Sequence, residues 1–175
     1  MGHEIGRRDL IRITAGAAIV SKVRAAGLPK FFTPEEYALV EELTELIIPA
    51  DEKSGGAKAA KVTDYIDATL AEAFEQAVRD TWRKGLARVN AISREMHDGA
   101  FLKCTAAQQT AILTRMAANE QNPKTTEELF FTDLKGFTIR SYYSSKIGIH
   151  DDMGYLGNSY QQGDYAGELP GKHRA

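Results

Sequence analysis

Apolar residues recur every three or four positions along most of the chain, and this period is typical of helices with one buried face. No segment alternates apolar and polar residues for long enough to indicate a β-strand. The pattern predicts about five helices in a single domain over residues 31–148, so the expected fold class is all-α. The expected helix ranges are 34–48, 63–74, 76–97, 106–121 and 126–147.

Threonine residues mark where several of these helices begin. Thr33 lies three residues before Glu36, which is the spacing of a capping box, in which two side chains satisfy two free backbone amides. Thr105 and Gln108 repeat the pattern at the fourth helix. Thr126 is expected to cap the fifth helix.

The same period predicts which side chains are buried. One stripe of the second helix is expected to contain Tyr65, Ile66, Leu70 and Phe74. The fifth helix has the most aromatic face of the chain, with Leu129, Phe130, Phe131, Leu134 and Phe137. Gly99 is expected to end the third helix, and residues 51–60, which are rich in small residues, are expected to form a loop.

Residues 1–30 differ from the rest of the chain. They carry Arg7 and Arg8, then an apolar run over residues 13–20 and small residues after it, which is the layout of a bacterial signal peptide. The two adjacent arginines resemble the twin-arginine export signal, which a receptor reads. The alternative interpretation is a basic amphipathic helix, because the apolar run is short and basic residues follow it.

Residues 149–175 combine closely spaced glycines with Tyr155, Tyr160 and Tyr165. Glycine is unfavourable in a helix, so we expect an irregular C-terminal arm. A disordered tail usually has few aromatic residues, whereas tyrosine suits protein interfaces. Two interpretations follow: a loop folded back on its own helices, or an arm laid on a partner protein.

Composition and charge exclude several classes of protein. The chain has 175 residues with 22 Lys+Arg against 24 Asp+Glu, a net charge of −2, whereas a nucleic-acid-binding domain is usually strongly basic. The one cysteine, Cys104, excludes an internal disulfide and a cysteine-based metal site. No apolar stretch approaches the roughly 20 residues that span a bilayer.

The sequence also lacks the common catalytic motifs. It has no dinucleotide-binding glycine motif, no P-loop, no zinc-protease histidine motif and no serine-hydrolase motif. His150, Asp151 and Asp152 form half of a possible metal site, but no further ligand lies nearby at helical spacing, which favours a solvated turn. We therefore expect no catalytic, cofactor-binding or metal-binding residue in this chain.

Several blocks of the sequence resemble one bacterial family, the small subunit of gluconate 2-dehydrogenase (subunit 3). Residues 32–51 are similar to the opening of that family, and residues 56–67 to its next block, which ends in Tyr-Ile-Asp. The closing pattern of the family is similar to residues 142–148, 153–155 and 163–167. The leader of the family is similar to the segment that carries Arg7 and Arg8.

The resemblance implies a non-catalytic subunit of a dehydrogenase complex. In such complexes a large FAD-containing subunit of the glucose–methanol–choline type oxidises a sugar or sugar acid, and a cytochrome c subunit with haem c commonly takes the electrons. The small subunit carries the twin-arginine signal and helps the flavin subunit to mature and leave the cytoplasm. The chain is then expected in the periplasm, with membrane association only through the complex, or in the cytoplasm if the leader does not function.

The partner interface predicted from the tyrosines consists of Tyr142, Tyr143, Tyr155, Tyr160 and Tyr165. Two other classes stay open at this point. One is a helical adaptor unrelated to redox chemistry, and the other is a free-standing enzyme that uses His150, Asp151 and Asp152.

Overall fold

The computed structural model describes residues 28–155, which form helices and no strand, so the predicted all-α class is confirmed. The long helices are α2 (Pro34–Ile47), α4 (Val62–Glu72), α5 (Gln76–His97), α6 (Ala106–Met116) and α7 (Thr126–Tyr143). Three short elements accompany them: α3 (Gly56–Ala59), the 3-10 turn η1 (Phe101–Lys103) and the π-helical segment η2 (Ile147–Asp152).

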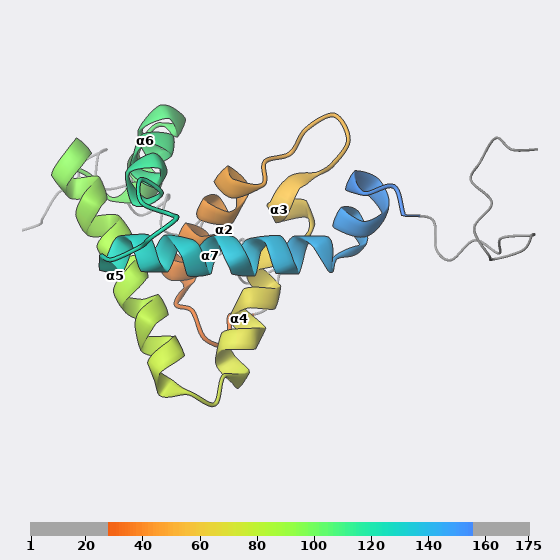
Figure 1. Ribbon diagram of the computed structural model, residues 1–175, viewed down its shortest axis with the longest axis horizontal. Helices are drawn as coiled ribbons and strands as arrows, with labels where there is room; N and C mark the ends of the chain where they lie inside the picture. Colours follow the sequence, from red (N-terminus) through yellow and green to blue (C-terminus); the bar gives the residue numbers. More distant parts are fainter. Residues whose placement is uncertain (1–27, 156–175) are drawn as a thin grey trace, which may run out of the picture.

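Helix α7 is the element around which the domain is arranged. Figure 1 shows it running across the other long helices, and it packs against α2, α4, α5 and α6. Its buried residues are Phe130, Phe131, Leu134, Thr138, Ser141 and Tyr142. Because each buried apolar side chain contributes about 1.5–3 kcal/mol, this face accounts for much of the cohesion between the helices.

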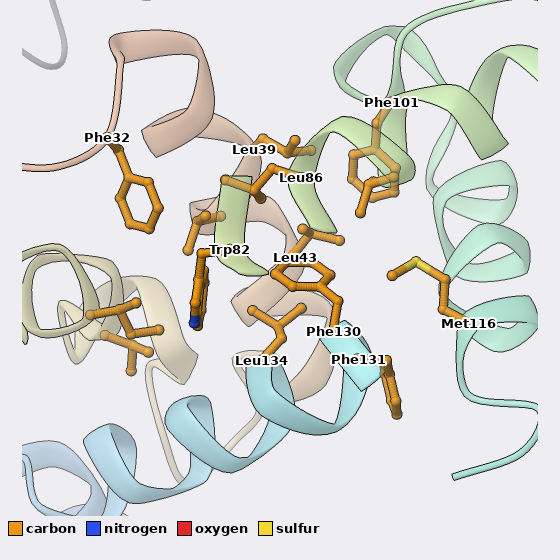
Figure 2. Packing of buried hydrophobic residues seen from close by; sticks show 14 of the residues in the cluster. Phe32, Leu39, Leu43, Trp82, Leu86, Phe101, Met116, Phe130, Phe131 and Leu134 are labelled. Atoms are coloured by element: carbon orange, nitrogen blue, oxygen red, sulfur yellow. The ribbon is translucent and has the colours of Figure 1, made fainter. Parts of the chain in front are cut away.

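Trp82 of α5 lies at the centre of the core and is fully buried. Its ring packs edge-on against Phe130 and Phe137 of α7, with centroid distances of 5.4 and 5.5 Å, and lies 5.9 Å from Phe32. Figure 2 shows Trp82 with Phe32, Phe130, Leu43 and Leu134. Edge-on aromatic pairs add to the free energy of burial, so Trp82 joins α5, α7 and the segment before α2.

Gly85, one turn after Trp82, explains how α5 and α7 approach so closely. A Cβ atom at Gly85 would lie 2.1 Å from Cδ2 of Phe130, which is far inside van der Waals contact. Glycine costs up to about 1 kcal/mol in a helix relative to alanine. Here that cost is offset because the Phe130 ring packs directly on the backbone of α5.

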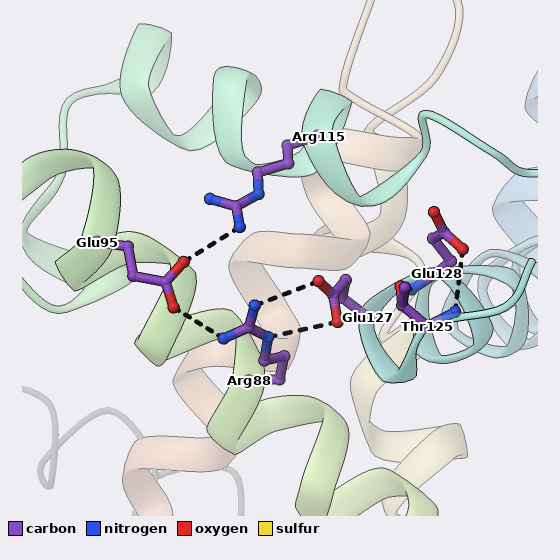
Figure 3. A network of polar contacts seen from close by, with 6 residues as sticks. All are labelled: Arg88, Glu95, Arg115, Thr125, Glu127 and Glu128. Carbon is purple, nitrogen blue, oxygen red and sulfur yellow. Dashed lines mark hydrogen bonds and ion pairs between the residues drawn. The ribbon is translucent and has the colours of Figure 1, made fainter.

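Polar contacts join α5, α6 and α7 at one edge of the domain (Figure 3). Arg88 binds Glu95 at 2.8 Å and Glu127 at 3.3 Å, and Arg115 binds Glu95 at 3.1 Å. The hydrogen bond from Arg88 is the largest cause of the lowered pKa of Glu127. Since these side chains are partly exposed, each pair contributes less than about 1 kcal/mol.

The helix starts at Thr33 and Thr105 are confirmed, because both side chains form complete capping boxes. The cap of α7 is Thr125 and not Thr126, since the Thr125 side chain accepts from the amide of Glu128. Helix α5 ends at His97, close to the predicted stop at Gly99, and the residue in the left-handed conformation there is Asp98. The predicted loop over residues 51–60 contains the short helix α3.

Some predicted burial is wrong. Tyr65 is 47% exposed and Phe74 fully exposed, because α4 ends at Glu72 and its buried face is shifted toward Ile66 and Leu70. Leu129 on α7 is 48% exposed. In this sequence the apolar residues therefore predict where helices form more reliably than they predict which face of a helix is buried.

Candidate partner-binding surface

Most of the large apolar side chains that are exposed in residues 28–155 belong to α7 and the segment after it. They are Leu129, Ile139, Tyr143, Met153 and Tyr155, with exposed fractions between 41% and 63%. Ile139 and Tyr143 are four residues apart, so they lie on one face of α7. Leu129 lies near the start of α7, so we call the other four residues, at the end of the helix and beyond it, the α7 apolar surface.

Tyr142 is adjacent in sequence to this surface but points the other way. It is 1% exposed and belongs to the core, and its hydroxyl contacts Oγ of Ser54. This corrects the prediction that Tyr142 contributes to a partner interface, because its side chain is covered by its own domain. The reason is the helical period, which places two consecutive residues about 100° apart around the axis.

Ser54 in turn fixes the loop before α3 against the end of α7. The backbone amides of Lys53 and Ser54 both donate to Oδ1 of Asp51 at 2.8 Å. The amide of Gly56 donates to Oγ of Ser54 at 3.3 Å. The first part of the predicted loop is therefore a tight turn held by Asp51 and Tyr142.

The segment after α7 folds back on the helix end through η2. A Cβ atom at Gly148 would lie 2.1 Å from the carbonyl oxygen of Tyr142, so only glycine permits this approach. A hydrogen bond to Asp152 is the main cause of the raised pKa of Tyr143. Nδ1 of His150 lies 2.7 Å from the carbonyl oxygen of Tyr155. Because η2 covers Ile147–Asp152, residues 149–152 are helical, and this corrects the irregular arm predicted from residue 149 onward.

These contacts indicate a structural role for the segment that contains His150 and Asp152. The hydrogen bond between Nδ1 of His150 and the carbonyl oxygen of Tyr155 stabilises the fold-back of η2, and Asp152 lies close to Tyr143. No group of three or more His, Cys, Asp and Glu side chains within residues 28–155 could hold a metal ion. The arrangement of η2 thus leaves Tyr143, Met153 and Tyr155 exposed.

A separate cavity of about 510 Å³ lies between the start of α2, the middle of α5 and η1. Apolar side chains of Leu39, Leu86 and Leu102 contribute to its wall, and charged groups of Glu35, Arg94 and Lys103 contribute as well. Because these charges have both signs, the cavity wall does not favour a ligand of one charge over the other.

The structure also reveals a buried residue that the sequence analysis did not single out. Asp67 is 5% exposed and accepts hydrogen bonds from three backbone amides of residues 30–32. The available signal was an acidic residue on the buried side of α4, in register with Thr63, Ile66 and Leu70. The predicted site residues Arg7, Arg8, Tyr160 and Tyr165 lie outside the described residues.

The domain is thus a helical bundle that presents an apolar surface at the end of one long helix. The family model of gluconate 2-dehydrogenase subunit 3 matches residues 34–162. The chain therefore belongs to the gluconate 2-dehydrogenase subunit 3 family, as its sequence blocks indicated, and this family is a subunit of a dehydrogenase complex. No curated protein and no solved structure matches the chain. Among residues 28–155, no helix has the length and apolar character needed to cross a membrane.

Proposed function

We propose that this chain is the non-catalytic small subunit of an FAD-dependent sugar or sugar-acid dehydrogenase complex, and that it escorts the flavin subunit through twin-arginine export. Membership of the subunit 3 family supports the accessory role. Arg7 and Arg8, followed by an apolar run, support the export role. In this account the flavin subunit is of the glucose–methanol–choline type and supplies the chemistry.

The observation that carries the proposal is the α7 apolar surface. Apolar side chains that are exposed together on one part of a protein are typical of an interaction site. Tyrosine and methionine are enriched at protein interfaces, and here Tyr143, Met153 and Tyr155 are presented together by the η2 fold-back. Tyr160 and Tyr165 follow in the sequence and extend the same chemistry along the arm.

The remaining parts of the complex follow from the same proposal. A cytochrome c subunit with haem c is the third component where one is present, and the assembled complex works in the periplasm. The small subunit needs no cofactor for this role, since its tasks are to bind the flavin subunit, to keep it folded and to carry the export signal.

A single charge placed in the α7 apolar surface tests the interface. Ile139→Glu introduces a carboxylate on the exposed face of α7, and burying that charge against a partner costs several kcal/mol. We expect the flavin subunit to stop copurifying with the variant, which itself keeps its helix content. The matched control is Phe74→Glu, because Phe74 is fully exposed in the connection between α4 and α5, away from the end of α7 (Figure 1).

The two variants separate the outcomes clearly. Loss of the flavin subunit from Ile139→Glu and its retention by Phe74→Glu supports the proposed interface. Retention of the flavin subunit by both variants at equal affinity contradicts it. Loss from Phe74→Glu alone places the interface at the other end of the domain.

A further inference from the structure

Asp67 binds the backbone of the segment that leads from the predicted leader into the domain. Oδ2 accepts from the amide of Lys30 at 2.6 Å, and Oδ1 accepts from the amides of Phe31 and Phe32 at 3.0 and 2.8 Å. A buried carboxylate is tolerated only when its oxygens are hydrogen-bonded, and here three backbone donors fulfil that need. The carboxylate therefore fixes three consecutive residues at once.

Arg83 of α5 holds the same segment through different groups. Its guanidinium donates to the carbonyl oxygen of Phe31 at 2.5 Å and lies 4.2 Å from the centroid of the Phe31 ring. It also forms an ion pair with Glu36 near the start of α2. The next side chain, Phe32, is 4% exposed and packs near Trp82 in the core.

These contacts exist only when the domain is folded. Asp67 lies 35–37 residues from its three amide partners, and Arg83 lies 52 residues from Phe31. Helices α2, α4 and α5 must therefore be packed together before residues 30–32 can be held. In an unfolded chain the same backbone is free, since nothing within the segment itself supplies these bonds.

We propose that Asp67 and Arg83 form a latch over residues 30–32 that protects the junction between leader and domain from proteolysis. A protease binds its substrate as an extended strand, so the backbone must leave the latch before it can be cut. Folded chains then resist cleavage at this junction, and chains that have not folded are cut there. The inference rests on the proposed export role of the leader, and its consequence is that only folded subunits are offered for export.

Trypsin provides the direct test, because the bond between Lys30 and Phe31 lies inside the latch. We expect cleavage at this bond in the purified full-length chain to be about tenfold faster in Asp67→Asn and in Arg83→Ala than in the wild type. The readout is the mass of the fragment that begins at Phe31. The matched control is Asp64→Asn, since Asp64 is one turn earlier on α4 and bonds Tyr37 instead of the latch.

Circular dichroism of each variant shows whether the domain is still folded. If Asp67→Asn does not fold, Arg83→Ala decides the test. Equal cleavage rates in folded Arg83→Ala and in the wild type overturn the latch. An Asp64→Asn variant that is cut as fast as Asp67→Asn overturns it as well, since general destabilisation is then the cause.

Cells that express the chain with its flavin subunit separate this inference from the proposed function. Arg7→Lys with Arg8→Lys should keep the leader on the chain but leave both proteins in the cytoplasm. Asp67→Asn should leave both proteins there with the leader removed.

If the flavin subunit is exported despite the two lysines, the export role is contradicted, and the trypsin comparison alone decides the latch. If the lysines block export but Asp67→Asn keeps its leader and exports the flavin subunit normally, the latch is overturned and the proposed function stands.

Discussion

The hydroxyl groups of Tyr142 and Ser54 contact each other across 88 residues of sequence, and they join the end of α7 to the turn before α3. Both side chains are buried, so the contact between the two hydroxyls is largely shielded from water. The contact fixes the point from which η2 folds back. The position of the exposed Tyr143, Met153 and Tyr155 therefore depends on a buried hydrogen bond behind them.

Removal of one hydroxyl tests this dependence. Tyr142→Phe leaves Ser54 without its side-chain partner and should lower the free energy of unfolding by about 1–3 kcal/mol. Ser54→Ala should cost a similar amount, and the double variant should cost less than the sum, as expected for a direct contact. Urea unfolding of the three variants measures this. Additive effects would show that the two hydroxyls do not act on each other.

Two glycines of the long helices should respond to alanine in opposite ways. Gly85→Ala places a methyl group against Phe130 and should destabilise the domain by about 1–3 kcal/mol. Gly136→Ala in α7 meets no atom within 4 Å and should stabilise it by up to about 1 kcal/mol through helix propensity. Thermal unfolding of both variants is the measurement. A neutral Gly85→Ala would mean that α5 and α7 do not pack at this distance.

Acid should weaken the ion pair between Arg88 and Glu127. The pKa of Glu127 is lowered from 4.5 in the folded chain, mainly by the hydrogen bond from Arg88. Its contribution to stability is therefore present above the unfolded pKa and is lost as the pH falls through the lower folded value. The difference in unfolding free energy between wild type and Glu127→Gln should shrink as the pH falls below 4.5. A difference that grows on acidification would reverse the sign and contradict the assignment.

The helix starts could be predicted from sequence because each depends on residues three positions apart. Thr33 with Glu36 and Thr105 with Gln108 are local patterns, and both form the expected caps. Asp67 could not be assigned a role this way, because its partners at residues 30–32 lie more than 30 residues away.

The same limit applies to the candidate surface. A pair of adjacent tyrosines indicates an interface, but only the packing of α7 decides that Tyr142 faces the core and Tyr143 faces outward. The family, in contrast, was predicted correctly, because it is recognised from sequence blocks in the right order and not from contacts between distant residues.

The arm beyond Tyr155 can be removed to choose between the two interpretations of the tail. A chain that ends at Tyr155 keeps α7, η2 and the contact between His150 and the Tyr155 carbonyl. We expect an unchanged melting temperature and weaker copurification of the flavin subunit, because aromatic anchors often carry much of an interface's affinity. A clear loss of thermal stability with binding intact would show instead that the arm covers its own domain.

We propose that this chain binds a flavoprotein and holds no cofactor itself, and light absorption tests both parts. The most direct measurement is the absorbance spectrum of the tagged chain, purified from cells that express the whole complex, before and after its subunits are separated. We predict a flavin spectrum in the intact complex and a colourless, inactive small subunit after separation. Flavin or haem absorbance that stays with the separated chain, or purification without any flavoprotein, would contradict the account.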